Sequence, residues 1–217
     1  MSIKQNLNTI KQSLPDHVTL VAVSKTKPVS DLMEAYETGQ RIFGENKIQE
    51  MADKHQEMPK DIKWHMIGHV QTNKVKYMAE FVDLIHGVES FKLLKEINKQ
   101  AKKHDRIIDC LLQIKIASED SKFGMSPEDA STLLQSEDFS TLKNIKVIGV
   151  MGMATFTENQ DQIKQEFGVL KTTFDSLKTV HLDLETISMG MSGDYQLAID
   201  CGSTMVRVGS SIFGKRN

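Results

Sequence analysis

The chain has 217 residues and a formal net charge of -2 at pH 7, with 26% of its residues charged. This balance argues against nucleic acid as the main ligand, because no strong basic stripe is present. No run of about 18 apolar residues occurs, so we expect no membrane-spanning segment. The length and composition are those of an ordinary globular protein, and they predict one domain over residues 1–217.

The N-terminus and the cysteines indicate where the protein resides. Residues 1–17 lack the apolar core of a signal peptide and predict a short amphipathic helix instead. Cys110 and Cys201 are isolated from each other, which supports neither a disulfide framework nor a CxxC metal site. We therefore expect a reduced, cytoplasmic protein.

Apolar runs with strand character recur along the whole chain. They alternate with polar stretches in which apolar residues have helical spacing, such as 29–36, 91–103 and 160–177. The runs at 41–43 and 185–189 predict strands least strongly. The predicted strands are 18–23, 41–43, 63–67, 82–87, 107–116, 145–151, 185–189 and 204–209.

Three predicted helices begin with capping residues. Ser30 and Ser90 each precede a stretch with helical spacing, and Ser126 is followed by Pro127 at the first helical position. Strands separated by helices predict a parallel sheet, because parallel neighbours need a crossover connection. Eight such units in this length favour a compact (β/α)8 barrel. An open doubly wound sheet is the alternative.

Unusual residues fall just after the predicted strands, where an α/β barrel carries its active face. Small, polar and charged residues gather there, and the expected rim segments are Lys25, 44–46, 68–69, 122–124, 188–192, Arg207 and 209–211. The clustering predicts a site built from several strand ends.

The last two of these loops have the character of a phosphate site. Their small residues let backbone N–H groups approach an oxyanion, and barrels often bind phosphate after strands seven and eight. Hydroxyl donors are available from Ser188, Ser192, Ser203, Thr204, Ser210 and Ser211. The alternative is that both loops are only tight turns with caps.

Lys25 ends the first apolar run and can form a Schiff base if its amine is partly neutral. Desolvation and a nearby cation, Lys27 or Arg207, would lower its pKa and make it a better nucleophile. The alternative is a lysine whose ammonium group simply lies in water.

Arg207 alternates with Val206 and Val208, which points its side chain into the barrel. Pyridoxal phosphate (PLP) enzymes place an acidic residue or an arginine near the pyridine nitrogen. An arginine there disfavours protonation of that nitrogen and weakens the ring as an electron sink. A structural ion pair across the barrel is the alternative.

Other catalytic signatures are missing from the sequence. His65 and His69 straddle a strand and Gly68 and do not share a helical face, so we expect no metal site. Neither a P-loop nor a Gly-x-Ser-x-Gly elbow occurs. Trp64 is expected in the core or on the barrel exterior.

Six motifs, in order over nearly the whole chain, carry a family resemblance. AVSKTKP (22–28), FGENKIQE (43–50), WHMIGHVQTNK (64–74), SKFG (121–124), SMGMSGDYQLAI (188–199) and GSTMVRVGSSIFG (202–214) resemble the pyridoxal-phosphate homeostasis proteins, the YggS/PROSC-like group.

The resemblance implies a single-domain PLP-binding barrel similar to the N-terminal domains of alanine racemase and ornithine decarboxylase. It matches Lys25 to the Schiff-base lysine and Arg207 to the arginine facing the pyridine nitrogen. It also implies roles for Ser192, Gly209 and Ser210 at the phosphate, for Asn46 beside the cofactor, and for Lys122 in meeting a passing aldehyde. Two departures, Lys115 and the 154–156 turn, lie on the rim.

Three functions are compared. The family is understood as proteins that hold PLP, buffer it or deliver it to apo-enzymes, and that support vitamin B6 and amino-acid homeostasis without an established reaction. A PLP-dependent amino-acid racemase is the main alternative, but it needs acid/base groups on both faces of the substrate α-carbon. Tyr36, Tyr77 and Tyr195 are predicted on helices or helix starts, and none is an obvious acid/base group.

In alanine racemase, one such tyrosine comes from a β-rich second domain. Because the sequence ends at Asn217, we expect that domain to be absent. A barrel for another phosphorylated metabolite would leave Lys25 without a role. We therefore favour a carrier, acting as a monomer.

Overall fold

The computed structural model describes residues 2–117 and 123–214. Within them, parallel strands follow one another around a closed barrel, and the first strand pairs with the last. The (β/α)8 prediction is confirmed, and this closure rules out the open sheet. The strands are β1 (Thr19–Val23), β2 (Ile42–Glu45), β3 (Lys63–Met66), β4 (Val82–Val88), β5 (Ile108–Gln113), β6 (Ile145–Met151), β7 (Thr186–Ser188) and β8 (Met205–Val208).

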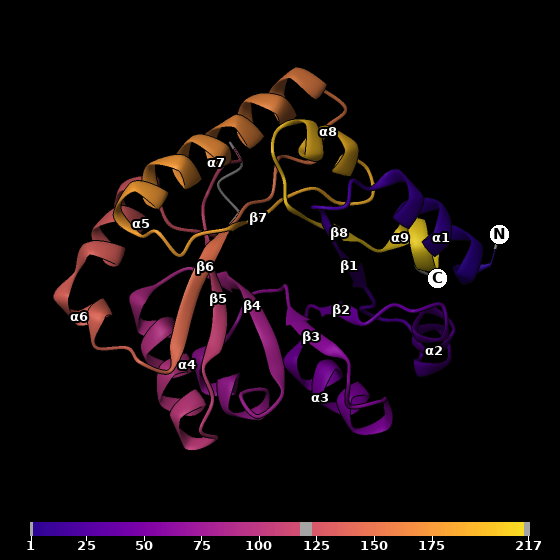
Figure 1. Ribbon diagram of the computed structural model, residues 1–217, viewed down its shortest axis with the longest axis horizontal. Coiled ribbons are helices and arrows are strands. Elements are labelled where there is room, and N and C mark those ends of the chain that lie inside the picture. The colour runs from indigo at the N-terminus through magenta and orange to yellow at the C-terminus, as the bar shows by residue number, and fades with distance from the viewer. Residues whose placement is uncertain (1, 118–122, 215–217) are drawn as a thin grey trace.

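Helices surround the strands, as Figure 1 shows. The N-terminal helix α1 lies against α9, where the Asn6 side chain donates to the Ile212 carbonyl at 3.0 Å. None of the helices in the described ranges is long and apolar enough to cross a membrane. The helices are α1 (Ile3–Ser13), α2 (Val29–Glu37), α3 (Ile48–Glu57), the 3-10 helix η1 (Thr72–Tyr77), α4 (Phe91–Lys103), α5 (Pro127–Gln135), α6 (Glu137–Ser140), α7 (Gln160–Val180), α8 (Tyr195–Asp200) and α9 (Ser210–Phe213).

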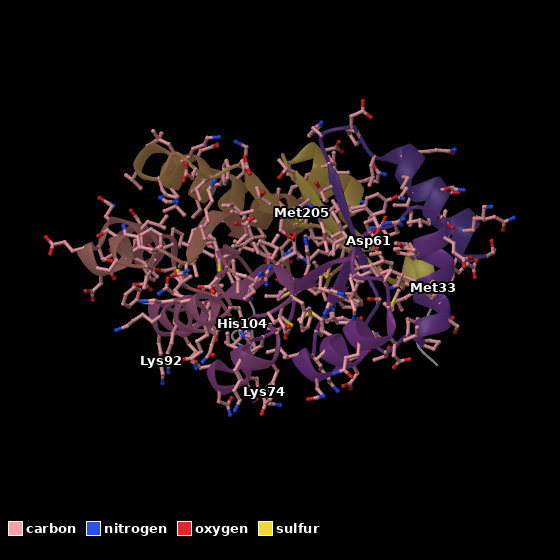
Figure 2. The ribbon with its side chains drawn as sticks, turned by 60° about the horizontal axis from the view of Figure 1, so that its bottom comes forward. Met33, Asp61, Lys74, Lys92, His104 and Met205 are labelled. Atoms are coloured by element: carbon pink, nitrogen blue, oxygen red, sulfur yellow. The ribbon has the colours of Figure 1, made fainter. Side chains whose placement is uncertain are left out.

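Both faces of each strand are buried, which is why the strands read as continuous apolar runs. Alternate residues, such as Leu20 and Ala22, pack against the helices, while Val21 faces the barrel axis. In Figure 2, Met205 lies amid other side chains and Lys92 at the margin. The small inner cluster consists of Val21, Ile67, Leu84, Leu111, Met151 and Met205.

The predicted strand at 107–116 is too long. Ile107 is 63% exposed, and β5 ends at Gln113. Beyond it, Ile114 forms only an isolated bridge with Met125, and the Lys115 N–H donates to the Met125 carbonyl at 3.0 Å. The sequence remains apolar here because Ile114 and Ile116 are still buried, although the backbone has left the sheet.

Two of the three predicted helix caps are confirmed. Ser90 accepts the Leu93 N–H at 3.3 Å, and Ser126 accepts the Asp129 N–H at 3.0 Å. The prediction for Ser30 is wrong, because α2 already begins at Val29 and its N-cap position is Pro28.

Gly149 is required where β6 meets β7. A Cβ atom there would overlap the Thr186 carbonyl oxygen and lie 2.9 Å from the Thr186 Cβ. We expect Gly149→Ala to lower the free energy of unfolding by about 1–3 kcal/mol in urea denaturation. Gly168→Ala is the control, because a Cβ on this α7 residue meets nothing within 4 Å. It should raise stability by about 0.5–1 kcal/mol, and equal losses in the two variants would contradict the prediction.

Candidate functional site

Lys25 lies in the turn that follows β1, and it is half-buried. The next residue, Thr26, has φ 63°, in the left-handed region that β-branched residues rarely adopt. Its N–H donates to Glu50 Oε1 at 2.5 Å, and the Lys27 N–H donates to the Ser24 carbonyl at 3.1 Å. The backbone on either side of Lys25 is therefore tied down.

A buried ionic cluster of Glu45, Glu50 and Lys54, here called the acidic clamp, holds this turn. Lys54 Nζ donates to the Ser24 carbonyl at 2.8 Å, to Glu45 Oε1 at 2.7 Å and to Glu50 Oε1 at 2.8 Å. The Ser24 hydroxyl donates to Glu45 Oε1 at 2.6 Å. Burial raises the pKa of Glu45, while the charge of Lys54 opposes that shift. The clamp thus holds both neighbours of Lys25. It takes one residue, Glu45, from β2 and two residues, Glu50 and Lys54, from α3.

A cavity of about 810 Å³ opens at the carboxyl end of the barrel. Its walls include segments at the ends of β1, β2, β3, β6, β7 and β8, as expected for a barrel site. Seven residues were predicted to bind the cofactor, and all but Ser188 line the cavity: Lys25, Asn46, Ser192, Arg207, Gly209 and Ser210.

Arg207 faces the cavity from β8 and is only 4% exposed. Its Nη1 donates to the Ser188 carbonyl at 2.8 Å and to the Ser188 hydroxyl at 2.6 Å, and Nη2 donates to the Gly152 carbonyl at 3.0 Å. Burial lowers the pKa of Arg207 to about 10, so it stays charged at neutral pH. These neutral acceptors hold the guanidinium in place, in contrast to the carboxylates that hold Lys54.

Ser192, in the loop after β7, is hydrogen-bonded to the turn after β8. The N–H groups of Gly209 and Ser211 donate to Ser192 Oγ at 3.1 and 3.5 Å. Small residues, backbone N–H groups and the hydroxyls of Ser192 and Ser210 are thus gathered on one wall of the cavity, which is the composition of a phosphate site. A Cβ on Gly209 would lie 3.1 Å from the Val23 carbonyl oxygen, so glycine permits the close approach to β1.

Ser188, Ser203 and Thr204 lie away from the cavity wall. Ser188 is fully buried behind Arg207. Ser203 donates to the Met189 carbonyl at 2.7 Å, and Thr204 Oγ1 accepts the Ile187 N–H at 2.9 Å. The last two hydroxyls therefore join β7 to the segment before β8.

Asn46 owes its place to a close contact between loops. A Cβ on Gly68 would lie 2.8 Å from the Asn46 Cα and would overlap the Asn46 carbonyl oxygen. Glycine at 68 therefore lets the ends of β2 and β3 come together and leaves Asn46 on the cavity wall.

Comparison with known proteins places the chain in a family. The whole chain, residues 1–217, matches the family described as the N-terminal domain of alanine racemase. The Haemophilus influenzae pyridoxal phosphate homeostasis protein is 37% identical over 232 residues, covering 100% of this chain and 97% of that protein. The Escherichia coli protein of the same name is 35% identical over 210 residues, covering 94% and 88%. The chain belongs to the pyridoxal phosphate homeostasis protein family.

Solved structures agree with this family assignment. PipY from Synechococcus elongatus, solved with PLP bound, is similar with a TM-score of 0.90 and 33% identity, over 98% of this chain and 100% of PipY. Alanine racemase from Clostridium difficile has a TM-score of 0.84 at 16% identity, and the match covers 99% of this chain but 60% of the racemase. That second likeness shows the shared barrel fold.

The sequence analysis placed the 154–156 turn on the rim but gave the segment after β6 no part in the site. Thr155, Phe156 and Thr157 line the cavity, and Phe156 is 97% exposed. The buried Glu166 of α7 holds this loop, because it accepts the Thr155 N–H at 2.6 Å and the Thr155 hydroxyl at 2.7 Å. Applying the strand-end rule to β6 would have found the loop. Lys122 lies outside the described residues.

The acidic clamp gives a test of how the Lys25 turn is held. Lys54→Met leaves Glu45 buried without its cation, and we expect the free energy of unfolding to fall by about 3–5 kcal/mol in urea denaturation. The control is Lys171→Met, which removes an exposed i,i+4 pair with Asp175 and should change stability by less than about 1 kcal/mol. A loss at Lys54 no larger than at Lys171 would show that the clamp does not stabilise the turn.

Proposed function

We propose that this protein binds PLP, holds it at Lys25 as a Schiff base and serves intracellular vitamin B6 homeostasis, with delivery of PLP to apo-enzymes. One observation carries the proposal: a single cavity is lined by Lys25, by the buried cation Arg207 and by Ser192 with the turn after β8. These three groups match, respectively, the aldehyde, the pyridine ring and the phosphate of PLP.

In this proposal, different residues of the cavity bind different parts of PLP. The Lys25 amine supplies the covalent attachment, and Arg207 presents positive charge to the ring nitrogen, which keeps that nitrogen unprotonated. Ser192, with the backbone of Gly209 and Ser210, binds the phosphate, and Asn46 lies beside the ring. When bound, PLP supplies an aldehyde carbon that accepts an amine and a ring that withdraws electrons.

The cavity suits exchange of a cofactor. Its volume of about 810 Å³ lies at the upper end of the range for small-molecule sites, and Phe156 and Met191 on its walls are exposed. A wide, accessible mouth favours release to another protein, whereas a sealed site favours chemistry on a bound substrate. We accordingly propose a monomeric, cytoplasmic carrier, one domain over residues 1–217, that meets apo-enzymes transiently.

A racemase is the alternative function, and it requires a second acid/base group across the substrate from Lys25. Of the residues that the structure describes, no tyrosine lines the cavity. The Tyr36 hydroxyl donates to Asp61 at 2.8 Å, and the Tyr195 hydroxyl lies 3.3 Å from Ser13 Oγ. Asp194 lines the cavity, but it accepts the Met191 N–H at 2.6 Å and so braces its own turn.

Borohydride reduction tests the binding site directly. The PLP-loaded protein, reduced and digested, should carry a phosphopyridoxyl group on Lys25 in peptide mass spectrometry, because hydride converts the Schiff base into a stable amine. Lys25→Ala should lose the Schiff-base absorbance band. Lys27→Ala is the control, since Lys27 lines the same cavity and donates to the Phe213 carbonyl at 2.8 Å. A band that persists in Lys25→Ala, or a label on Lys27, would refute the assignment.

The absence of racemase chemistry is a separate prediction. The PLP-loaded protein incubated with L-alanine should form no D-alanine by chiral chromatography, because the cavity offers no tyrosine as the second acid/base group. An alanine racemase preparation assayed in parallel verifies detection. Steady, enzyme-dependent formation of D-alanine would replace the carrier proposal by the racemase alternative.

A further inference from the structure

A chain of polar side chains crosses the barrel interior beneath the cavity. His65 on β3 and His86 on β4 lie with Nδ1 and Nε2, respectively, 3.1 Å apart. His86 Nδ1 lies 3.0 Å from the Ser188 hydroxyl, which in turn accepts Arg207 Nη1 at 2.6 Å. At the other end, His65 Nε2 lies 3.5 Å from Asp83 Oδ2, near the amino end of β4. We call these five side chains the polar relay.

Burial makes the polar relay energetically costly unless its members are hydrogen-bonded. His65, His86 and Ser188 are at most 2% exposed, and buried polar groups are costly unless they are hydrogen-bonded. Asp83 is different, since 43% of its side chain is exposed. The relay therefore runs from a buried cation below the cavity to a solvent-facing carboxylate at the opposite end of the barrel.

Both imidazole rings are neutral at neutral pH. Burial lowers the pKa of His65, although the hydrogen bond to Asp83 and the charge of Asp83 oppose the shift, as does the charge of Asp109, while Lys63 adds to it. Burial, the charge of Arg207 and the repulsion that a protonated His65 would exert place the pKa of His86 well below its ordinary value. A neutral imidazole has one N–H and one bare nitrogen, so each ring donates once and accepts once.

The two ends of the relay determine which way its hydrogen bonds run. The guanidinium of Arg207 can only donate, so Ser188 Oγ accepts from it and can in turn donate its own hydrogen to His86 Nδ1. His86 then carries its proton on Nε2 and donates to His65 Nδ1. His65 in turn carries its proton on Nε2 and donates to Asp83.

The opposite direction fails at the carboxylate. If His86 donated from Nδ1 to Ser188, its bare Nε2 would accept from His65 Nδ1. The bare Nε2 of His65 would then face Asp83, and two acceptors would meet. The arrangement with a proton between His65 Nε2 and Asp83 is therefore the favoured one, and this hydrogen bond lowers the pKa of Asp83.

We propose that His86 is the positioning residue for Arg207: together with His65 and Asp83, it fixes the Ser188 hydroxyl as an acceptor and so orients the guanidinium toward the cavity. The role given to Arg207 at the cofactor ring rests on the proposed function, whereas the direction of the relay does not. Hydrogen bonds aligned in one direction polarise one another, which strengthens the Ser188 acceptor. An acidic side chain at the far end of the barrel is thereby coupled to the cavity.

The tautomers of the two histidines test the relay in the protein without PLP. Nitrogen-15 NMR of histidine side chains at neutral pH should find the proton on Nε2 and a bare Nδ1 in both His65 and His86. His65→Gln and His86→Gln assign the signals. A proton on Nδ1 of His86 would overturn the proposal, because the Ser188 hydroxyl would then have no acceptor in the relay.

Paired variants at the amino end of the barrel separate the hydrogen bond from general electrostatics. Asp83→Ala removes the terminal acceptor, and we expect the bare-nitrogen signals of both histidines to shift toward a mixture of tautomers. Asp109→Ala is the control, because Asp109 acts on His65 by its charge from the start of β5, and it should leave the tautomers unchanged. Equal shifts in both variants, or none in Asp83→Ala, would contradict the relay.

The PLP-loaded protein gives the final readout. Asp83 is partly exposed, so Asp83→Ala disturbs folding less than a variant of the buried His86 would. We expect the cofactor absorbance maximum of Asp83→Ala to differ from that of Asp109→Ala. An unmoved maximum in a protein whose tautomers have changed would show that the relay does not position Arg207. Failure of the unmodified protein to bind PLP would instead refute the proposed function, while the tautomers still decide the relay.

Discussion

Pairing of β1 with β8 is the constraint on which the cavity depends. The register places Val21 opposite Arg207 and Ala22 opposite Val208, so the strand that leads to Lys25 and the strand that carries Arg207 end side by side. Gly209 keeps this junction tight, because a side chain there would press on Val23. A shift of one residue would turn Arg207 from the barrel axis to the helix layer and bring Val208 inward.

Two buried cations are held in opposite ways, and the difference has a physical reason. Lys54 is surrounded by carboxylates and is fully engaged in holding the Lys25 turn. Arg207 is held by two backbone carbonyls and a hydroxyl, none of which cancels its charge. Its positive field therefore reaches the cavity, where an electron-rich ring nitrogen would interact with it favourably. The first cation is structural, and the second has charge to offer a ligand.

The barrel interior is divided between an apolar layer and the polar relay. Val21, Ile67, Leu84, Leu111, Met151 and Met205 pack around the axis, and polar groups from β3, β4, β7 and β8 pass between them. Apolar side chains would fill this space without needing hydrogen-bond partners, whereas every member of the polar relay needs one. The geometry couples these costly groups to Arg207, and a role in holding that guanidinium accounts for their presence.

Local patterns in the sequence predicted the strands, most helix starts and the group of residues at the rim. These patterns are the continuous apolar runs, the capping serines and the polar residues after strands. The family resemblance added the ligand. The folded barrel was needed to show that Ser188 lies behind Arg207, that Glu45 and Lys54 hold the Lys25 turn, and that Glu166 anchors the loop after β6. The end of β5 was likewise misjudged from sequence, because buried residues outside a sheet look like strand residues. The three contacts join side chains from different elements of the barrel, and which side chains meet follows from strand register and closure, which no local pattern specifies.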